Sequence, residues 1–357
     1  MKKKVLIGMS GGVDSSVAAY LLKKEGYEVI GATMKLWEDA NPTCNSLIAI
    51  EKAKKVAKDL DIPHHVFDFK DTFDKNIVQY FIAEYLKGKT PNPCVICNRE
   101  VKFGELLKKA EEMGIDYIAT GHYARVVKPS RKTGGRYLLR KGEDKDKDQS
   151  YFLYRLTQDQ LSKTLFPLGS ITKKKVRKIA KKIGLTVAEE RDSQEVCFIP
   201  DNDYKKFIEN NIKTTPREGD IVDEEGKVLG KHFGIHKYTV GQRKGVKTIS
   251  NDPLYVIGID KERNQIIVGP EESLYTSKLT AKDTNWIIPT LVKKNTPLKA
   301  KIRYRAEEMD CEITNIEESN KDRVTISFKE KQRAISPGQS VVLYKKDLVV
   351  GGGIITK

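Results

Sequence analysis

Hydrophobic and polar positions along the first 125 residues follow two alternating patterns. Residues 5–9 form a short apolar run that ends at paired glycines, which is typical of a buried parallel strand. Apolar residues between Val17 and Leu22 then recur at helical spacing, and Gly26 follows where a helix would end. The chain is therefore expected to open with a strand, a glycine loop and a helix.

This alternation continues to about residue 125. It predicts strands at residues 27–34, 66–69 and 117–120, and helices at residues 53–60, 73–81 and 106–113. Strands that alternate with helices predict an α/β fold with a doubly wound parallel sheet. Ligands of such sheets bind beyond the carboxyl ends of the strands, so residues 8–15, Met34 and residues 121–122 are expected to line one crevice.

The pattern changes in the second half of the chain. Short glycine-rich segments after about residue 210 predict a small β-rich middle domain. From about residue 280 the chain has the pattern of strands alone, and residues 298–306 alternate strictly, with basic residues on one face. Such a row of cations suits a small C-terminal β-barrel that holds a nucleic-acid backbone, and an ordinary strand with basic residues outward is the alternative. We predict three domains, at residues 1–205, 206–279 and 280–357.

Two charged segments interrupt the first domain. Residues 128–149 are rich in charge and turn formers, which predicts an exposed, mobile excursion. Thr172 then precedes a helix that ends near Gly184, and lysine and arginine cover all but its apolar face. A solvated helix is favoured over a direct phosphate contact here.

The glycine loop after the first strand has the chemistry of a phosphate-binding site. Gly11 and Gly12 lack Cβ atoms, so backbone N–H groups can approach an anion at a helix N-terminus, where Ser10 and Ser15 add hydroxyl donors. The loop has no lysine of the P-loop type, and the G-K-T triplet at residues 88–90 lacks the first glycine of that motif. S-G-G-x-D-S instead resembles the loop of the ATP pyrophosphatases, which split ATP into AMP and pyrophosphate. A glycine-rich turn without a ligand is the alternative.

Net charge indicates which kind of partner the chain binds, and hydropathy indicates whether it enters a membrane. The formal net charge of the 357 residues is +16, which favours a polyanionic macromolecule as partner, with a solvated lysine-rich surface as the alternative. No apolar run approaches the roughly 18 residues of a membrane helix, and the run after Met1 is too short for a signal peptide. We expect a cytoplasmic protein without a membrane partner, and a monomer.

The five cysteines are scattered through the chain, which argues against a disulfide framework. Cys94 and Cys97 lie in a proline-rich segment just before a predicted helix, where a nearby helix dipole favours thiolates. Cys197 follows one hundred residues after Cys97, among apolar neighbours. Cys44 and Cys311 receive no role and are expected to be buried.

These segments together resemble the tRNA-specific 2-thiouridylases, in order and over nearly the whole chain. The matching segments are residues 8–15 (GMSGGVDS), 34–37 (MKLW), 90–93 (TPNP), 97–98 (CN), 121–123 (GHY), 148–153 (DQSYFL), 192–193 (DS), 197–199 (CFI) and 238–245 (YTVGQRKG). Only the glycine loop and the cysteine segments are specific by themselves.

The resemblance implies a reaction in two steps. ATP, with Mg²⁺, adenylates the C2 oxygen of the wobble uridine of certain tRNAs, and a persulfide on Cys197 replaces that oxygen with sulfur. Cys97 would release the sulfur by forming a disulfide with Cys197, which a reductant must then reset. The implied ATP-binding residues are Gly8, Met9, Ser10, Gly11, Gly12, Val13, Asp14, Ser15, Met34 and Gly121.

The resemblance also implies contacts with tRNA and a sulfur donor. The target base must leave its stack to react, and Asn92 and Pro93, with Cys94 beside them, would line its pocket. The other implied tRNA contacts are His122, Lys147, Asp148, Gln149, Arg303, Tyr304 and Gln339. The sulfur donor is a cysteine desulfurase, a relay protein or sulfide.

One position departs from the family pattern. The best-known members have an aspartate where this chain has Cys94, so the proton-transfer assignment is open. Cys94, Cys97 and Cys197 could instead hold an iron–sulfur cluster through three thiolates, as in some related tRNA thiolases. Zinc is less favoured, because C-x-x-C occurs once and no suitably spaced histidine follows.

Two other functions compete with thiolation. Another ATP pyrophosphatase could form an amide or guanidine bond, but that chemistry does not call for two separated thiols and a basic β tail. An RNA-binding protein could keep ATP only as a structural ligand. Release of AMP and pyrophosphate in the presence of tRNA separates these possibilities.

Overall fold

The computed structural model describes residues 2–37, 47–185, 187–188, 196–199, 202–212, 216–250, 252–317 and 322–356. The chain divides into two compact units. Unit 1 comprises Met1–Val78, Cys94–Asn202 and Asp347–Val349, and unit 2 comprises Gln79–Pro93, Asp203–Lys346 and Val350–Lys357.

Unit 1 is built on a five-stranded sheet with the order β3-β2-β1-β4-β7, and all its pairings are parallel. Its strands are β1 (Lys4–Gly8), β2 (Glu28–Lys35), β3 (His64–Asp68), β4 (Tyr117–Ala119) and β7 (Thr164–Leu165). The chain moves outward from β1 to β3 and then returns to β4 on the other side of β1. The topological switch point therefore lies between β1 and β4, and the predicted doubly wound α/β fold is confirmed.

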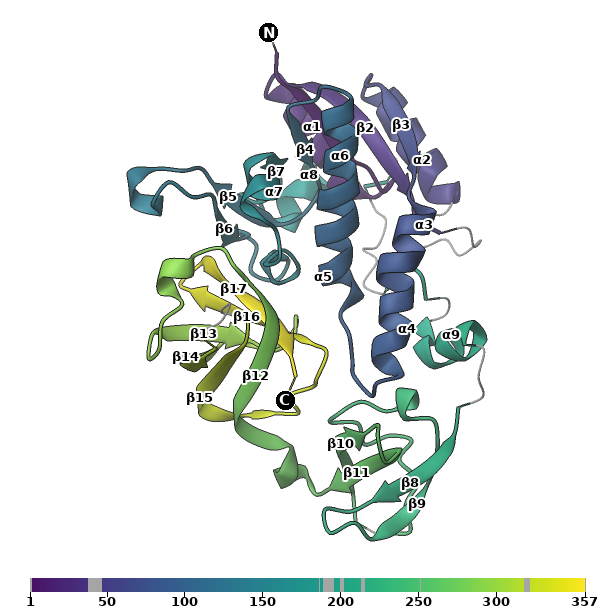
Figure 1. Ribbon diagram of the computed structural model, residues 1–357. Helices are drawn as coiled ribbons and strands as arrows, with labels where there is room; N and C mark the ends of the chain where they lie inside the picture. The colour runs from purple at the N-terminus through teal and green to yellow at the C-terminus, as the bar shows by residue number, and fades with distance from the viewer. Residues whose placement is uncertain are drawn as a thin grey trace. The chain divides into compact units, whose positions relative to one another are not determined.

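The described helices of unit 1 are α1 (Val13–Lys24), α2 (Leu47–Asp59), α3 (Lys70–Phe73), α5 (Pro93–Cys97), α6 (Leu106–Glu112), α7 (Gln158–Ser162) and α8 (Lys173–Lys182). Of these, α1, α2 and α6 pack against the sheet, α8 packs against α1, and α5 lies away from the sheet (Figure 1). Val17 of α1 and Val176 of α8 are fully buried in one core with Val5 and Ile7 of β1. Burial of each such side chain stabilises the fold by roughly 1.5–3 kcal/mol. Within the described ranges, no helix is long and apolar enough to span a bilayer.

The helix predicted at residues 106–113 is the last part of a longer one. It begins at Pro93 as α5, continues as the π-helical segment Asn98–Glu105 and ends as α6, and Figure 1 shows one continuous helix. Gln160 Nε2 donates to the carbonyls of Arg99 and Phe103, each at 2.9 Å, which supports the wider turns. Segments of π-helix are frequent at functional sites.

The charged stretch at residues 128–149 is exposed over most of residues 128–135, as its composition predicts, but its later part contains a strand and a closed turn. β5 (Ala124–Val127) and β6 (Leu138–Lys141) pair as an antiparallel hairpin just before and within this stretch. Farther along, the buried Asp148 carboxylate accepts hydrogen bonds from Gly142 N at 2.9 Å and from Ser150 Oγ at 2.8 Å. A carboxylate that closes a turn thus orders a segment rich in charge.

Unit 2 contains the expected β-rich middle part. Its sheet has the order β10-β11-β8-β9, from β8 (Glu218–Val222), β9 (Val228–Phe233), β10 (Tyr255–Asp260) and β11 (Gln265–Gly269). Ile221, Val256 and Ile266 are fully buried in its core. Next to it, α4 (Gln79–Tyr85) and α9 (Tyr204–Asn211) meet through the stacked rings of Tyr85 and Tyr204, whose centroids lie 4.7 Å apart.

The C-terminal strands form the predicted barrel. They are β12 (Tyr275–Trp286), β13 (Pro297–Lys301), β14 (Met309–Ile316), β15 (Val324–Arg333), β16 (Ser340–Lys345) and β17 (Leu348–Ile355). Their order is β12-β15-β14-β13-β16-β17, and pairing of β12 with β17 closes the barrel. Closure leaves no open sheet edge in this part.

The basic row predicted along residues 298–306 is wrong. β13 ends at Lys301, and the chain then turns, so Arg303 and Arg305 lie outside the strand. Arg303 Nη2 donates to the carbonyls of Arg333 at 2.8 Å and Ala334 at 2.9 Å, so its side chain binds the turn instead of continuing the row. Alternation alone did not reveal where the strand stops.

Candidate functional site

The loop between β1 and α1 has the backbone geometry of an anion site. Gly11 has φ +74°, and a Cβ added there would lie 2.8 Å from the carbonyl oxygen of Ala49 in α2. Gly12 is the N-cap of α1, and a Cβ there would meet only Ser10 Oγ, at 3.6 Å, within 4 Å. The loop therefore packs against α2 at Gly11. At Gly12 the described residues leave room for a ligand next to the partly positive end of α1.

Serine hydroxyls shape this loop. Ser15 Oγ accepts a hydrogen bond from Ser10 N at 3.2 Å and lies 3.4 Å from Ser10 Oγ. Ser16 Oγ donates to Gly12 O at 2.9 Å. Ser10 is exposed while Ser15 is buried, so Ser10 presents its hydroxyl at the surface of the loop and Ser15 holds the loop closed.

Buried polar groups hold the loop from below. Thr33 Oγ1, in β2, donates to Met9 O at 2.9 Å, and His64 Nε2 lies 2.9 Å from the same hydroxyl. Because the hydroxyl's only proton goes to Met9, Nε2 of His64 must be the donor. Met34, which the sequence placed in this site, is buried, and its Cε would lie 3.7 Å from a Cβ on Gly8.

The second wall of the crevice follows β4, across the switch point. A Cβ on Gly121 would lie 2.8 Å from Ser15 N, so only glycine lets this loop approach the start of α1 so closely. The structure thus brings together residues 8–15, Met34 and Gly121, as the sequence predicts. They enclose the position where open α/β sheets bind nucleotides.

Two further residues belong to this site but were not predicted from the sequence. Lys173 Nζ donates to both carboxylate oxygens of Asp14 at 2.7 Å, and Tyr123 OH donates to Asp14 Oδ1 at 2.7 Å. The Lys173 side chain is only 10% exposed, although its helix reads as a solvated one. Burial of a charge is costly without a partner, so this lysine differs in kind from its exposed neighbours. No motif in the sequence pointed to it.

His122 is held as a neutral imidazole. Its Nδ1 lies 2.7 Å from Thr120 Oγ1, and its ring packs between the rings of Phe103 and Phe166. Burial, with a smaller contribution from Lys102, lowers the pKa of His122 well below its usual range. At neutral pH this residue is therefore suited to hydrogen bonding or stacking, not to pairing with a phosphate.

The lowered pKa of His122 predicts a pH dependence of stability. As the pH falls from about 7 to 5, the unfolded chain binds a proton at this imidazole that the folded chain does not bind, so the free energy of unfolding decreases. Replacing His122 with asparagine should reduce that slope by up to about 1.4 kcal/mol per pH unit. Denaturant unfolding at several pH values measures it, and an unchanged slope would contradict the assignment.

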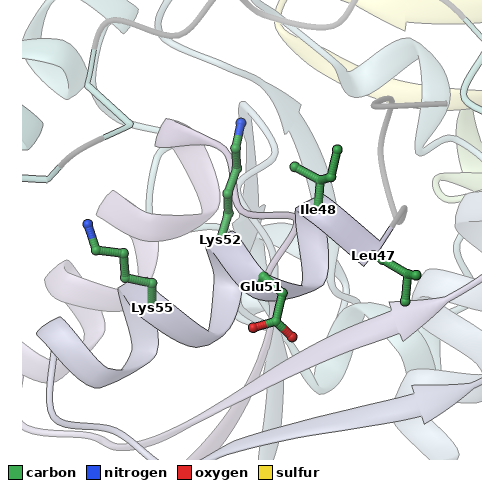
Figure 2. A pocket seen from close by; sticks show the side chains of 5 residues that line it. All are labelled: Leu47, Ile48, Glu51, Lys52 and Lys55. Atoms are coloured by element: carbon green, nitrogen blue, oxygen red, sulfur yellow. The ribbon is translucent and has the colours of Figure 1, made fainter. Parts of the chain in front are cut away.

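A surface depression on α2 adjoins the glycine loop. Figure 2 shows its lining by Leu47, Ile48, Glu51, Lys52 and Lys55, with Lys52 and Ile48 extending to the same side of the helix. A Cβ on Gly11 would lie 2.8 Å from Lys52 Cβ, so Lys52 begins directly beside the loop. The helical periodicity of the sequence did not predict that this basic residue lies next to the glycine loop.

Cys94 and Cys97 lie on α5, at the start of the long helix. Cys94 is exposed and Cys97 is buried. Leu106, nine residues after Cys97, packs near Gly8 at the carboxyl end of β1, since a Cβ on Gly8 would lie 3.6 Å from its Cδ2. Because this helix returns toward the start of β4, Cys97 lies at its far end, more than two turns from Leu106 and beyond the carboxyl edge of the sheet.

The segment of Cys197 is anchored at the same edge of the sheet. Phe198 is buried, and its ring centroid lies 6.4 Å from that of Trp37, just after β2, and 5.6 Å from that of Phe73. Cys197 itself is partly exposed. The glycine loop and the segment of Cys197 therefore lie at the carboxyl edge of the unit 1 sheet, and Cys97 lies beyond the same edge.

The cysteines do not form a metal site in the described structure. Among the described residues, which include Cys94, Cys97 and Cys197, no three His, Cys, Asp or Glu side chains are grouped so that they could hold a metal ion. Cys311 is buried in the barrel as expected, and burial raises the pKa of its thiol to about 12. Cys44 and residues 192–193 lie outside the described residues.

The residues implied to contact tRNA in unit 1 differ in accessibility. The Asp148 carboxylate is occupied by its own turn, as described above. Gln149 Oε1 accepts from Tyr123 N at 3.0 Å, and Gln149 N donates to Tyr123 O at 2.9 Å. Lys147 is partly exposed. Gln149 is thus bonded to Tyr123, the residue that follows His122 after β4, while Lys147 and Asp148 bond within their own turn.

In unit 2, one implied tRNA contact, Gln339, binds the segment at residues 90–93. Gln339 Nε2 donates to Thr90 O at 2.8 Å, and Thr90 N donates to Pro337 O at 2.8 Å. Thr90 Oγ1 lies 3.3 Å from Thr239 Oγ1. Asn92 and Tyr304 are partly exposed and Pro93 is buried. Gln339 thus fixes the backbone next to Asn92.

The parallel sheet, the switch-point loop and the helix N-terminus define a nucleotide-binding domain of the ATP-pyrophosphatase class. Residues 3–201 match the family described as tRNA methyl transferase HUP domain. Residues 205–270 match the tRNA methyl transferase PRC-barrel domain, and residues 276–355 match the aminomethyltransferase beta-barrel domain.

Relatives match the chain over its full length. It is 51% identical over 363 residues to tRNA-specific 2-thiouridylase MnmA 1 of Clostridium botulinum (strain Hall), covering 100% of both chains. It is 53% identical over 364 residues to the protein of the same name in Caldanaerobacter subterraneus subsp. tengcongensis, covering 100% of this chain and 99% of the relative. The chain belongs to the tRNA-specific 2-thiouridylase family.

A solved structure shows a weaker likeness. The U34-tRNA thiolase NcsA from Methanococcus maripaludis, solved with its [4Fe-4S] cluster, is 21% identical and has a TM-score of 0.35. The match covers 54% of this chain and 60% of that one. Similarity at this level carries no argument about the chemistry of this chain.

Proposed function

We propose that this chain is a tRNA 2-thiouridine synthase, which uses ATP to activate the C2 oxygen of the wobble uridine and then replaces that oxygen with sulfur. The observation that carries the proposal is the shared location of the glycine loop, Cys97 and Cys197 at one edge of the unit 1 sheet. The full-length relatives named tRNA-specific 2-thiouridylase support it. These relatives do not favour the alternative function, an ATP pyrophosphatase that forms an amide or guanidine bond.

In the first step, the C2 oxygen of uridine attacks the α-phosphorus of ATP and expels pyrophosphate. The C2 carbonyl is a poor electrophile with a poor leaving group, and adenylation makes AMP the leaving group. Backbone N–H groups at Gly12 and the Ser10 hydroxyl would bind the departing phosphates at the N-terminus of α1. Mg²⁺ would neutralise part of their charge. The Asp14 carboxylate of this loop is already paired with Lys173 and Tyr123, so the substrate phosphates and water would supply most of the Mg²⁺ ligands.

In the second step, the terminal sulfur of a persulfide on Cys197 attacks C2, and AMP leaves with the original oxygen. Cys97 thiolate then attacks Cys197 Sγ, which breaks the S–S bond and leaves sulfur on the base as 2-thiouridine. The products are a Cys97–Cys197 disulfide and the modified tRNA. After a dithiol reductant has reset the enzyme, a persulfide-carrying protein transfers its terminal sulfur to the Cys197 thiolate and keeps a thiol itself. Sulfide would instead have to attack Cys197 Sγ of the disulfide, which breaks the S–S bond, releases the Cys97 thiolate and forms the Cys197 persulfide without a separate reductant.

Free thiols, and not an iron–sulfur cluster, carry the sulfur in this reaction. Three cysteines that hold a cluster must lie around one iron–sulfur core, and the described side chains offer no such group. Anaerobic purification with an iron assay tests this choice. Colourless, active enzyme supports the persulfide route, and visible absorbance lost on replacing Cys94 with alanine would overturn it.

The uridine must leave the anticodon stack to reach this edge of the sheet. We propose that Asn92 and Pro93 line its pocket and that Cys94 stands beside it. Lys147, Gln149 and His122 of unit 1 are proposed tRNA contacts, and Arg303, Tyr304 and Gln339 are proposed contacts from unit 2. Asp148 would act through the turn that it closes.

The function is tested by incubating the purified chain with ATP, Mg²⁺, transcript tRNA and a persulfide donor, here a cysteine desulfurase with cysteine. We expect AMP, pyrophosphate and 2-thiouridine in equal amounts, the last measured by mass spectrometry. The same transcript with cytidine at the wobble position is the matched control and should give none of them. ATP binding without AMP release in the presence of the uridine transcript would identify a non-catalytic RNA-binding protein instead.

A further inference from the structure

The Asp14 carboxylate in the glycine loop is held by two side chains from outside the loop. Lys173, from α8, contacts both carboxylate oxygens, and Tyr123, just after β4, donates its hydroxyl to one of them, all at 2.7 Å. Tyr123 is 2% exposed. Asp14 lies in the first turn of α1, so these contacts fix the helix end that would bind phosphate.

The backbones of both residues also connect to one segment, residues 142–149. Tyr123 exchanges two hydrogen bonds with Gln149, through its N at 3.0 Å and its O at 2.9 Å. Lys173 N donates to Asp144 Oδ2 at 2.8 Å, which ties the start of α8 to the same segment. This segment carries Lys147 and Gln149, the proposed tRNA contacts. An unbroken path of hydrogen bonds therefore runs from the proposed RNA contact to the ATP loop.

We propose that Tyr123 and Lys173 are positioning residues that couple tRNA contact at residues 147–149 to the geometry of the ATP loop. The inference rests on the proposed function, because it takes ATP and tRNA as the two ligands. A shift of Gln149 moves the Tyr123 backbone, and the Tyr123 hydroxyl carries the shift to Asp14. Lys173 has a second effect, because it neutralises a carboxylate that would otherwise repel phosphate at this helix end.

The test is a linkage measurement that needs no turnover. The dissociation constant of α,β-methylene ATP is measured by calorimetry with and without wobble-uridine tRNA. In the unaltered chain, we expect tRNA to tighten the analogue at least about fivefold. Tyr123→Phe removes one hydroxyl and should leave the affinity without tRNA within about threefold, while the coupling factor falls toward one. Lys173→Met should weaken the analogue about tenfold even without tRNA, and Lys173→Arg should recover part of that loss.

Matched controls separate positioning from stability. Tyr117→Phe removes a hydroxyl that accepts from Lys3 Nζ at 2.9 Å at the amino end of β4, and should leave the coupling unchanged. Lys174→Met changes an exposed neighbour on α8 and should do the same. If Tyr123→Phe unfolds, Asp144→Ala, which removes the contact to Lys173 N, tests the second connection between the segment and Asp14, and coupling should again fall.

The outcomes are distinct. Full coupling in folded Tyr123→Phe, or a coupling factor of one in the unaltered chain, overturns the inference while leaving thiolation possible. Failure of the unaltered chain to bind tRNA at all overturns the proposed function, and the inference with it. Selective loss of coupling in Tyr123→Phe supports the inference whether or not the sulfur step proceeds by persulfide.

Discussion

Replacing Cys197 with serine is expected to lower 2-thiouridine formation at least about a thousandfold, because a hydroxyl cannot carry persulfide sulfur. The exchange does not touch the glycine loop, so one turnover of pyrophosphate release per enzyme should remain when tRNA and ATP are supplied. Replacing Cys97 with serine should stop the reaction one step later. A tRNA–protein adduct held through a disulfide to Cys197 should then accumulate and disappear on addition of dithiothreitol.

The control for the cysteine variants is Cys311→Ala. Cys311 is buried in the barrel and burial keeps its thiol protonated, with a pKa of about 12, so its loss should leave thiolation intact. Mass spectrometry of the nucleosides and non-reducing electrophoresis provide the measurements. A Cys197→Ser enzyme that keeps a tenth or more of the activity would remove Cys197 from the reaction.

Gly11→Ala is expected to weaken ATP binding at least about a hundredfold. The backbone of Gly11 has φ +74°, where a side chain costs roughly 1–2 kcal/mol. The added Cβ would also lie 2.8 Å from the carbonyl oxygen of Ala49 and from Lys52 Cβ. The loop must move to relieve these contacts, and the N–H groups that would bind phosphate move with it. Calorimetric titration with α,β-methylene ATP measures the loss.

Gly135→Ala is the matched control for this strain. Gly135 also has φ +74°, but nothing lies within 4 Å of an added Cβ. Its replacement should cost a similar amount of stability and leave ATP affinity unchanged. Equal ATP affinity in both variants would show that the close packing under Gly11 does not shape the nucleotide site.

Local patterns predicted the elements that their own residues determine. The apolar run after Lys4, the glycine loop and the helical spacing of α1 predicted the strand-loop-helix unit. The alternation of strands with helices predicted that the sheet of unit 1 is parallel. Thr172 caps α8, as expected, through a hydrogen bond from Lys175 N. Hydrophobic period and caps are local properties, so the sequence alone carries them.

Contacts between distant segments were not predictable in this way. Lys173 and Asp14 are 159 positions apart, and nothing in the run of lysines on α8 distinguishes Lys173 from Lys174. Only packing of α8 on α1 buries one of them beside a carboxylate. In the same way, Arg303 leaves the strand pattern because the carbonyls of Arg333 and Ala334 lie within its reach. Tertiary geometry decided both cases.

The most direct test of the account follows the oxygen atom of the target base. A tRNA with ¹⁸O at C2 of the wobble uridine is thiolated with ATP, and the released AMP is analysed by mass spectrometry. Adenylation of that oxygen predicts one ¹⁸O atom in the phosphate of AMP for each 2-thiouridine formed. Thiolated tRNA accompanied by unlabelled AMP would mean that ATP cleavage and sulfur insertion do not act on the same carbonyl, which would contradict the mechanism.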